Sequence, residues 1–113
     1  MALGLNGDLF YPLRDQQHAG RSPGADLFGA DRGIGAPLGA PPVALLRVGE
    51  DQIYRPETAT EAATDVRQMA TRHPDLIKLW LDDLLGTAPK LKPEIYRTPI
   101  FKQAVATNEQ NLI

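Results

Sequence analysis

A single lysine interrupts the most apolar run of the chain. The run extends from Pro74 to Asp83, and Lys78 occupies its middle. A short apolar run that follows a turn residue is typical of a buried strand. Lysine is almost never fully buried unless a partner neutralises it. The run therefore predicts either an edge strand or a functional site.

The size and composition of the chain exclude several classes of function. Its 113 residues fit one small domain or a piece of a larger one. A net charge of −2 gives no electrostatic reason to expect nucleic acid or an anionic membrane as a partner. No apolar run reaches membrane-spanning length, and the absence of Cys excludes disulfides and thiolate metal sites. The N-terminus lacks the pattern of a secretory signal, so we expect a cytoplasmic location by default.

Local signals predict three helices. The first covers residues 9–19, with Pro12 in its first turn. The second begins at Thr58, where Glu61 stands at the spacing of a capping box, and it ends before the proline at position 74. A third helix opens at Pro93. The apolar residues of the second helix recur with a period near 3.6, which predicts one buried face.

Extended segments and loops alternate with these helices. Residues 25–30 are a weak strand candidate, and residues 75–83 are a stronger one. Residues 29–42 contain four Gly and three Pro, and a loop of that length is usually functional or mobile. Residues 86–92 form a second loop. Alternating strands and helices indicate βαβ units, and hence an α/β fold with a parallel sheet.

The strand through Lys78 is expected to present two different faces. Ile77 and Leu79 share an apolar face with Leu81, which suits a sheet surface covered by helices. The opposite face carries Lys78 with Leu76, Trp80 and Asp82. In a closed parallel barrel this second face is the interior, and active sites lie at the carboxyl ends of the strands.

A longer pattern around this strand resembles a known family. Residues 75–83, followed by residues 86–97, resemble the metal-dependent amidohydrolases related to imidazolonepropionase and Xaa-Pro dipeptidase. Upstream, residues 24–28 and the Gly-Ile-Gly-Ala-Pro stretch at residues 33–37 are similar to the third strand and its loop in that family.

The resemblance covers residues 5–97 and implies a partial (β/α)8 barrel, from about the second strand to the fourth helix. Residues 1–97 would be this amidohydrolase-like portion, and residues 98–113 would be a divergent tail. Such a slice would expose unpaired strand edges, through which we expect self-association.

The resemblance also implies a chemistry for Lys78. Members of the family bind one or two divalent metals, commonly zinc, and hydrolyse a C–N bond of an amide, cyclic amide or peptide-like substrate. Lys78 stands where the family has a lysine that is carboxylated and bridges the metals, so it is the candidate metal ligand. The sequence has no His-x-His, which the family uses as ligands. We therefore expect a chain that is incomplete and inactive alone, with no catalytic residue of its own.

Simpler interpretations exist for each of these residues. Lys78 can be a solvent-facing lysine on an edge strand, and the whole chain can be a non-catalytic interaction or structural piece. Asp82 and Asp83 can merely begin a loop. His18 and His73 suit helix C-termini, where the dipole favours them. Trp80 suits the core. The Gly33-x-Gly35 pattern suits a flexible loop. A solvated surface is the simplest place for Arg14, Asp15, Lys90 and Lys92.

Overall fold

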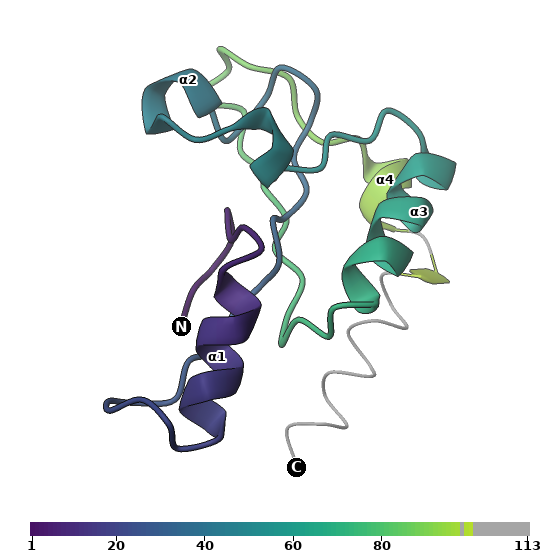
Figure 1. The fold of residues 1–113 in the computed structure, drawn as a ribbon. Helices are drawn as coiled ribbons and strands as arrows, with labels where there is room; N and C mark the ends of the chain where they lie inside the picture. Colours follow the sequence, from purple (N-terminus) through teal and green to yellow (C-terminus); the bar gives the residue numbers. More distant parts are fainter. Residues whose placement is uncertain (98, 101–113) are drawn as a thin grey trace.

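Four α-helices and one 3₁₀ helix account for the regular structure of residues 1–97. The computed structural model describes residues 1–97 and 99–100 (Figure 1). The helices are α1 (Phe10–His18), α2 (Val43–Leu46), α3 (Ala59–Ala70) and α4 (Pro93–Tyr96), with the 3₁₀ helix η1 at Glu50–Gln52. Within the described part of the chain, no helix is long and apolar enough to cross a membrane.

The predicted helix boundaries are largely confirmed, because each rests on a local signal. The Thr58 hydroxyl accepts a hydrogen bond from the Glu61 amide at 3.2 Å and caps α3. The Glu61 carboxylate accepts from the Glu57 amide at 2.7 Å, one residue earlier than a capping box requires. Pro93 occupies the first turn of α4, where its missing N–H costs no helical hydrogen bond.

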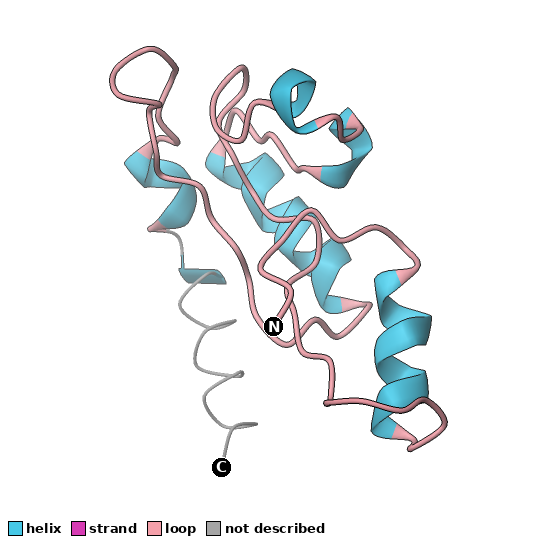
Figure 2. Ribbon diagram, turned by 90° about the vertical axis from the view of Figure 1, so that its left-hand side faces the viewer, coloured by secondary structure: helices cyan, strands magenta, loops and turns pink. Residues whose placement is uncertain are grey.

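The predicted parallel sheet and the partial (β/α)8 barrel are wrong. Residues 1–97 and 99–100 contain no strand, and their β-pairing is limited to isolated bridges (Figure 2). The two strand candidates, residues 25–30 and 75–83, are extended segments that each contribute single bridging residues. The predicted tail, residues 98–113, lies outside the described residues except for positions 99 and 100.

Two features of the central chain explain why the bridges do not extend into a ladder. The Asp31 carboxylate accepts the amide of Arg32 at 2.6 Å, so a side chain takes a backbone donor that a ladder would use. Gly33 has φ +92°, outside the β region. Pairing is interrupted at both places, and only single bridges form on either side of them.

The bridges nevertheless place three extended segments side by side in chain order. We call them the N-terminal segment (residues 1–5), the central segment (residues 28–36) and the lysine segment (residues 75–80). Parallel bridges join the N-terminal to the central segment and the central to the lysine segment. Helix α1 follows the N-terminal segment, and α3 lies in the chain between the central and lysine segments (Figure 1).

The apolar core lies between α3, α4 and the central segment. Ile34 of the central segment is fully buried and belongs to the same cluster as Met69 of α3 and Ile95 of α4. Ile77 and Leu79 of the lysine segment pack against this cluster. The clearest amphipathic helix of the sequence therefore covers one face of the extended chain.

The loop predicted over residues 29–42 is a packed part of the molecule. Most of its residues are buried, and Arg55 fastens its second half. The Arg55 guanidinium donates to the carbonyls of Ala36 and Pro41 at 2.7 Å each, and to those of Gly39 and Ala40 at 3.3 Å each. These bonds supply donors to a loop that forms no strand ladder, where the Ala36 carbonyl also accepts from the Gly39 amide at 2.9 Å.

Candidate functional site

Lys78 lies in the middle of the lysine segment and is half-buried. Its carbonyl accepts from the Ile34 amide at 2.9 Å, which fixes the backbone against the central segment. Its ammonium lies 5.4 Å from the centroid of the Trp80 ring, at cation–π distance. The ring in turn lies so close to Gly4 and Gly33 that a Cβ at either glycine would collide with it. The side chain of Lys78 therefore lies against a Trp80 ring that is itself held by its neighbours.

The predicted division of the lysine segment into two faces holds over residues 77–80. Ile77 and Leu79 face the core cluster, and Lys78 and Trp80 lie against Gly4 of the N-terminal segment. Strand-like alternation thus survives without a sheet, because the backbone is extended. Leu81 departs from the pattern, since it is 50% exposed.

The residues around Lys78 do not form a metal site. The described residues contain no group of three or more His, Cys, Asp or Glu side chains that could hold a metal ion. A zinc site needs three or four protein ligands, and Lys78 would supply one. The zinc that the family resemblance implies therefore does not fit the described part of this chain.

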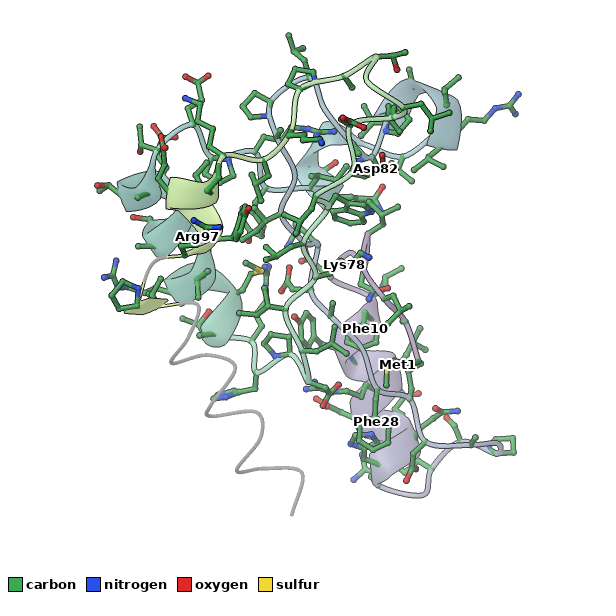
Figure 3. The ribbon with its side chains drawn as sticks, turned by 180° about the vertical axis from the view of Figure 1, so that it is seen from behind. Met1, Phe10, Phe28, Lys78, Asp82 and Arg97 are labelled. Atoms are coloured by element: carbon green, nitrogen blue, oxygen red, sulfur yellow. The ribbon has the colours of Figure 1, made fainter. Side chains whose placement is uncertain are left out.

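Asp82 and Asp83 begin a turn, as the simpler interpretation predicts. The Asp82 carboxylate accepts from the Leu84 amide at 2.7 Å. Asp83 forms an ion pair with Lys90 at 3.0 Å, and the hydrogen bond from Lys90 lowers the pKa of Asp83. Both carboxylates are thus engaged in local contacts, at the end of the molecule where Figure 3 shows Asp82.

A second set of polar residues is gathered by the central segment. Asp31 is 1% exposed, and its carboxylate meets three elements of the molecule. It accepts a short hydrogen bond from the Tyr11 hydroxyl of α1. It pairs with the Arg72 guanidinium, which follows α3, at 2.8 Å. Arg72 also donates to the Tyr54 hydroxyl at 2.9 Å. We call these four residues and Arg32 the charged cluster.

The charged cluster is a structural site, because the Asp31 carboxylate has no open position. One oxygen accepts from the Arg32 amide and from Arg72, and the other accepts from Tyr11 and lies against Arg72. Burial and the hydrogen bond to Asp31 raise the pKa of Tyr11 above its ordinary value. Burial opposes the charge of Arg72, but Asp31 and Tyr54 raise its pKa overall. The cluster is therefore a fixed contact that joins α1 and the chain after α3 to the central segment.

Arg14 corrects another expectation. Its predicted place was the solvated surface, but it is 8% exposed. It donates to the carbonyl of His73 at 2.7 Å and lies 3.3 Å from the Asp75 carboxylate. Asp75 also accepts from the Gly29 amide at 2.9 Å, so the arginine joins α1 to both the central and lysine segments. The guanidinium also lies over the ring of Tyr11.

Sequence reasoning overlooked Asp31 and Arg72 for a clear reason. Asp31 lies in a Gly-rich stretch that predicts a loop, and Arg72 lies off the apolar face of α3. The available signal was the small residues around Asp31, namely Gly29, Ala30 and Gly33, which let other chain segments approach closely.

One pocket lies on the same side of the central segment as α4. Its volume is about 260 Å³, and its lining is mainly apolar: Ala36, Pro37, Pro56, Glu57, Pro89, Lys90, Leu91, Lys92 and Ile95. The lining contains no histidine and does not include Lys78. The charged residues of the lining are Glu57, Lys90 and Lys92, so this pocket is separate from the site around Lys78.

Comparison with known proteins found no relative. The chain matches no protein-family model, no curated protein and no solved structure.

Proposed function

We propose that the chain is related by descent to the metal-dependent amidohydrolases and is inactive alone. The parent activity is the hydrolysis of a C–N bond in a small amide-type substrate. The observation that carries the proposal is the position of Lys78. It lies at the centre of the third of three parallel extended segments, on the side away from the core residues that contact α3 and α4.

The chemistry of Lys78 supports the same proposal. Its side chain is half-buried and held along Trp80, which limits the conformations that the amine can take. A lysine amine can react with carbon dioxide to give a carbamate, which is an anionic oxygen ligand. The remaining ligands lie outside the described residues, which hold no group of three or more metal-ligating side chains, and we propose that another polypeptide supplies them. The proposed role of this chain is thus one ligand of a composite site.

Reconstitution with a complementary chain tests the proposal. The chain is co-expressed with the products of the neighbouring reading frames, and the complex is assayed for zinc and for hydrolysis of a panel of amides. We expect stoichiometric zinc only in a complex whose partner supplies a His-x-His. Isotope-labelled bicarbonate should give a carbamate signal by NMR that the Lys78→Ala variant lacks. Lys92→Ala, at an exposed lysine, is the matched control. Neighbouring frames without the missing histidines would contradict the proposal.

A second candidate function is a non-catalytic piece that adds its extended chain to a partner. Its support is the outer edge of the lysine segment. The amides of Ile77 and Leu79 form no hydrogen bond within the described part of the chain, whereas the Trp80 amide donates to Ile34. A partner strand could pair with these free donors. Hydrogen exchange separates the two candidates, because protection of the Leu79 amide in a complex that lacks zinc and hydrolysis would favour this one.

A further inference from the structure

One asparagine side chain joins the N-terminal segment to the central segment. Asn6 lies directly after the N-terminal segment and is half-buried. Its Nδ2 donates to the carbonyl of Ala2 at 3.2 Å and to that of Ala30 at 2.6 Å. Both acceptors are backbone carbonyls, so this contact between the two segments requires a side chain that donates two hydrogen bonds.

The residue that follows Asn6 makes this side chain chemically reactive. In an Asn-Gly pair the backbone nitrogen of the glycine can attack the side-chain Cγ of the asparagine, because glycine has no Cβ to hinder the approach. The new N–Cγ bond forms, the Cγ–Nδ2 bond breaks, and the proton of the attacking nitrogen leaves with ammonia. Water then opens the cyclic imide at either carbonyl carbon and gives aspartate or isoaspartate. The reaction needs no reactant other than water.

The attacking nitrogen of Gly7 is unobstructed. Within the described part of the chain, the Gly7 amide donates no hydrogen bond. A Cβ built at Gly7 would meet no atom within 4 Å, so no neighbouring group crowds the site of attack. Asn6 is also the only asparagine of the sequence that precedes a glycine, since Asn108 precedes Glu and Asn111 precedes Leu.

We propose that Asn6 is a site of spontaneous deamidation through Gly7, and that the product releases the N-terminal segment from the central segment. A carboxylate accepts hydrogen bonds and donates none. After the reaction, an anionic oxygen would therefore face the carbonyl oxygens of Ala2 and Ala30. Ala30 is fully buried, so the loss of a donor to its carbonyl is costly.

Release of the N-terminal segment uncovers the lysine segment. A Cβ added at Gly4 would lie 2.9 Å from Trp80 Cη2 and 3.1 Å from Lys78 Cγ, so the N-terminal backbone lies directly on these two side chains. Deamidation therefore exposes Lys78 and changes the surroundings of Trp80. The inference does not depend on the metal chemistry proposed for Lys78.

Mass spectrometry of the intact, purified chain tests the reactive site. After incubation in mildly alkaline buffer, fragmentation should locate the replacement of NH2 by OH at residue 6, well before any conversion of Asn108 or Asn111. Gly7→Ala is the matched control, because the methyl group fits the open space but hinders the attack, and it should lose most of the conversion. An unmodified Asn6, or equal conversion of all three asparagines, would overturn the assignment.

The docked contacts should control the rate of the reaction. Attack on Cγ requires the Asn6 side chain to leave its two carbonyl acceptors. The Gln52 Nε2 donates to the Leu5 carbonyl at 2.9 Å and so helps to hold the same segment. Gln52→Ala should therefore accelerate the deamidation of Asn6. An unchanged rate would show that the reaction does not depend on release of the segment.

The product itself tests the structural consequence. In Asn6→Asp, the emission of Trp80 should move to longer wavelength. The Ala30 amide, which donates to the Ala2 carbonyl at 2.9 Å, should lose protection from hydrogen exchange. Gln16→Glu adds the same charge at an exposed amide of α1 and should change neither signal.

Deamidated wild type, separated by ion exchange, should behave as Asn6→Asp does and keep the helical circular dichroism of the unmodified protein. Unchanged emission with a protected Ala30 amide, or loss of the whole helical signal, would overturn the release of this segment alone.

Discussion

At the scale of single residues, the structure depends on a buried carboxylate whose hydrogen-bonding positions are all filled. Asp31 is 1% exposed and receives donors from α1, from the residue after it and from the chain that follows α3. A buried ion pair contributes little net stability, but the loss of one partner is costly because the other charge stays buried. The Arg72 guanidinium lies 2.8 Å from the Asp31 carboxylate and 3.5 Å from that of Asp8, which is largely exposed, so Asp31 is the closer of the two neutralising groups.

Substitution of Asp31→Asn should therefore destabilise the fold strongly. The amide cannot neutralise Arg72, and we expect a loss of about 3–5 kcal/mol in the free energy of unfolding. Urea titration followed by the fluorescence of Trp80, the single tryptophan of the chain, measures it. The control is Asp26→Asn, at an exposed carboxylate, which should change the stability little. Equal effects of the two substitutions would show that the buried pair is unimportant.

Tyr11 should give the fold a defined sensitivity to alkali. Its pKa is raised above the ordinary value of 10.0 by burial first and then by its hydrogen bond to Asp31. The folded state therefore favours the neutral form of Tyr11. The stability that this preference contributes is present below pH 10 and is lost as the pH rises above that value. The stability difference between the wild type and Tyr11→Phe should shrink above pH 10 by up to about 1.4 kcal/mol per pH unit. A constant difference between pH 7 and 11 would contradict this assignment.

At the scale of elements, α3 begins at one well-defined cap. The Thr58 hydroxyl holds the Glu61 amide, and the helix supplies Met69 and two more buried residues to the core. Substitution of Thr58→Ala should cost about 1 kcal/mol in stability. Thr60→Ala is the matched control, because Thr60 lies inside the same helix, is exposed, and is replaced there by a better helix former. Thermal unfolding by circular dichroism measures both, and a larger loss in the control would exclude the capping role.

The approach of Trp80 to Gly33 is the most crowded contact between the extended segments. A Cβ at Gly33 would collide with the indole ring, and the φ of +92° disfavours every other residue type. Gly33→Ala should therefore cost about 1–3 kcal/mol or more, because both the ring and the backbone must move. Gly7→Ala, where a Cβ would meet no atom within 4 Å, should have little effect. The Trp80 emission maximum should shift in the first variant and remain unchanged in the second.

These elements also show where prediction from the sequence succeeds and fails. The caps at Thr58 and Pro93 are local, and the helices that they predict are confirmed. A sheet requires continuous pairing between distant segments, and the Asp31 side chain and the conformation of Gly33 interrupt it. The burial of Arg14 could not be predicted, since it depends on partners that lie about 60 positions away in the chain. The role of Lys78 as a metal ligand remains a prediction.

At the scale of the whole molecule, Ile34 is the residue on which the extended segments converge. It is fully buried and forms bridges to both Tyr54 and Leu79. Its side chain belongs to the cluster formed with α3 and α4. The same residue therefore joins the lysine segment, the chain before α3 and the apolar core.

Truncation of this side chain should affect the molecule as a unit. Ile34→Ala should cost about 2–5 kcal/mol, which is a large share of the 5–15 kcal/mol that stabilises an ordinary domain. We expect the variant to be substantially unfolded in moderate urea, with Trp80 fluorescence and circular dichroism changing together. Leu9→Ala, at a residue 78% exposed, is the control and should leave the midpoint unchanged. Separate transitions for the two signals would show that the helices and the extended segments unfold independently.

The loop over residues 29–42 depends on the chemical identity of Arg55. One guanidinium donates to four carbonyl groups of the same loop through a planar fork of donors. Lysine is the substitution most readily accepted at ordinary surface arginines, but its single ammonium cannot span this set of acceptors. Homologous chains that keep this loop should therefore have arginine at this site, even where neighbouring basic residues vary. Where the arginine is replaced, the loop should be shorter or differ in sequence.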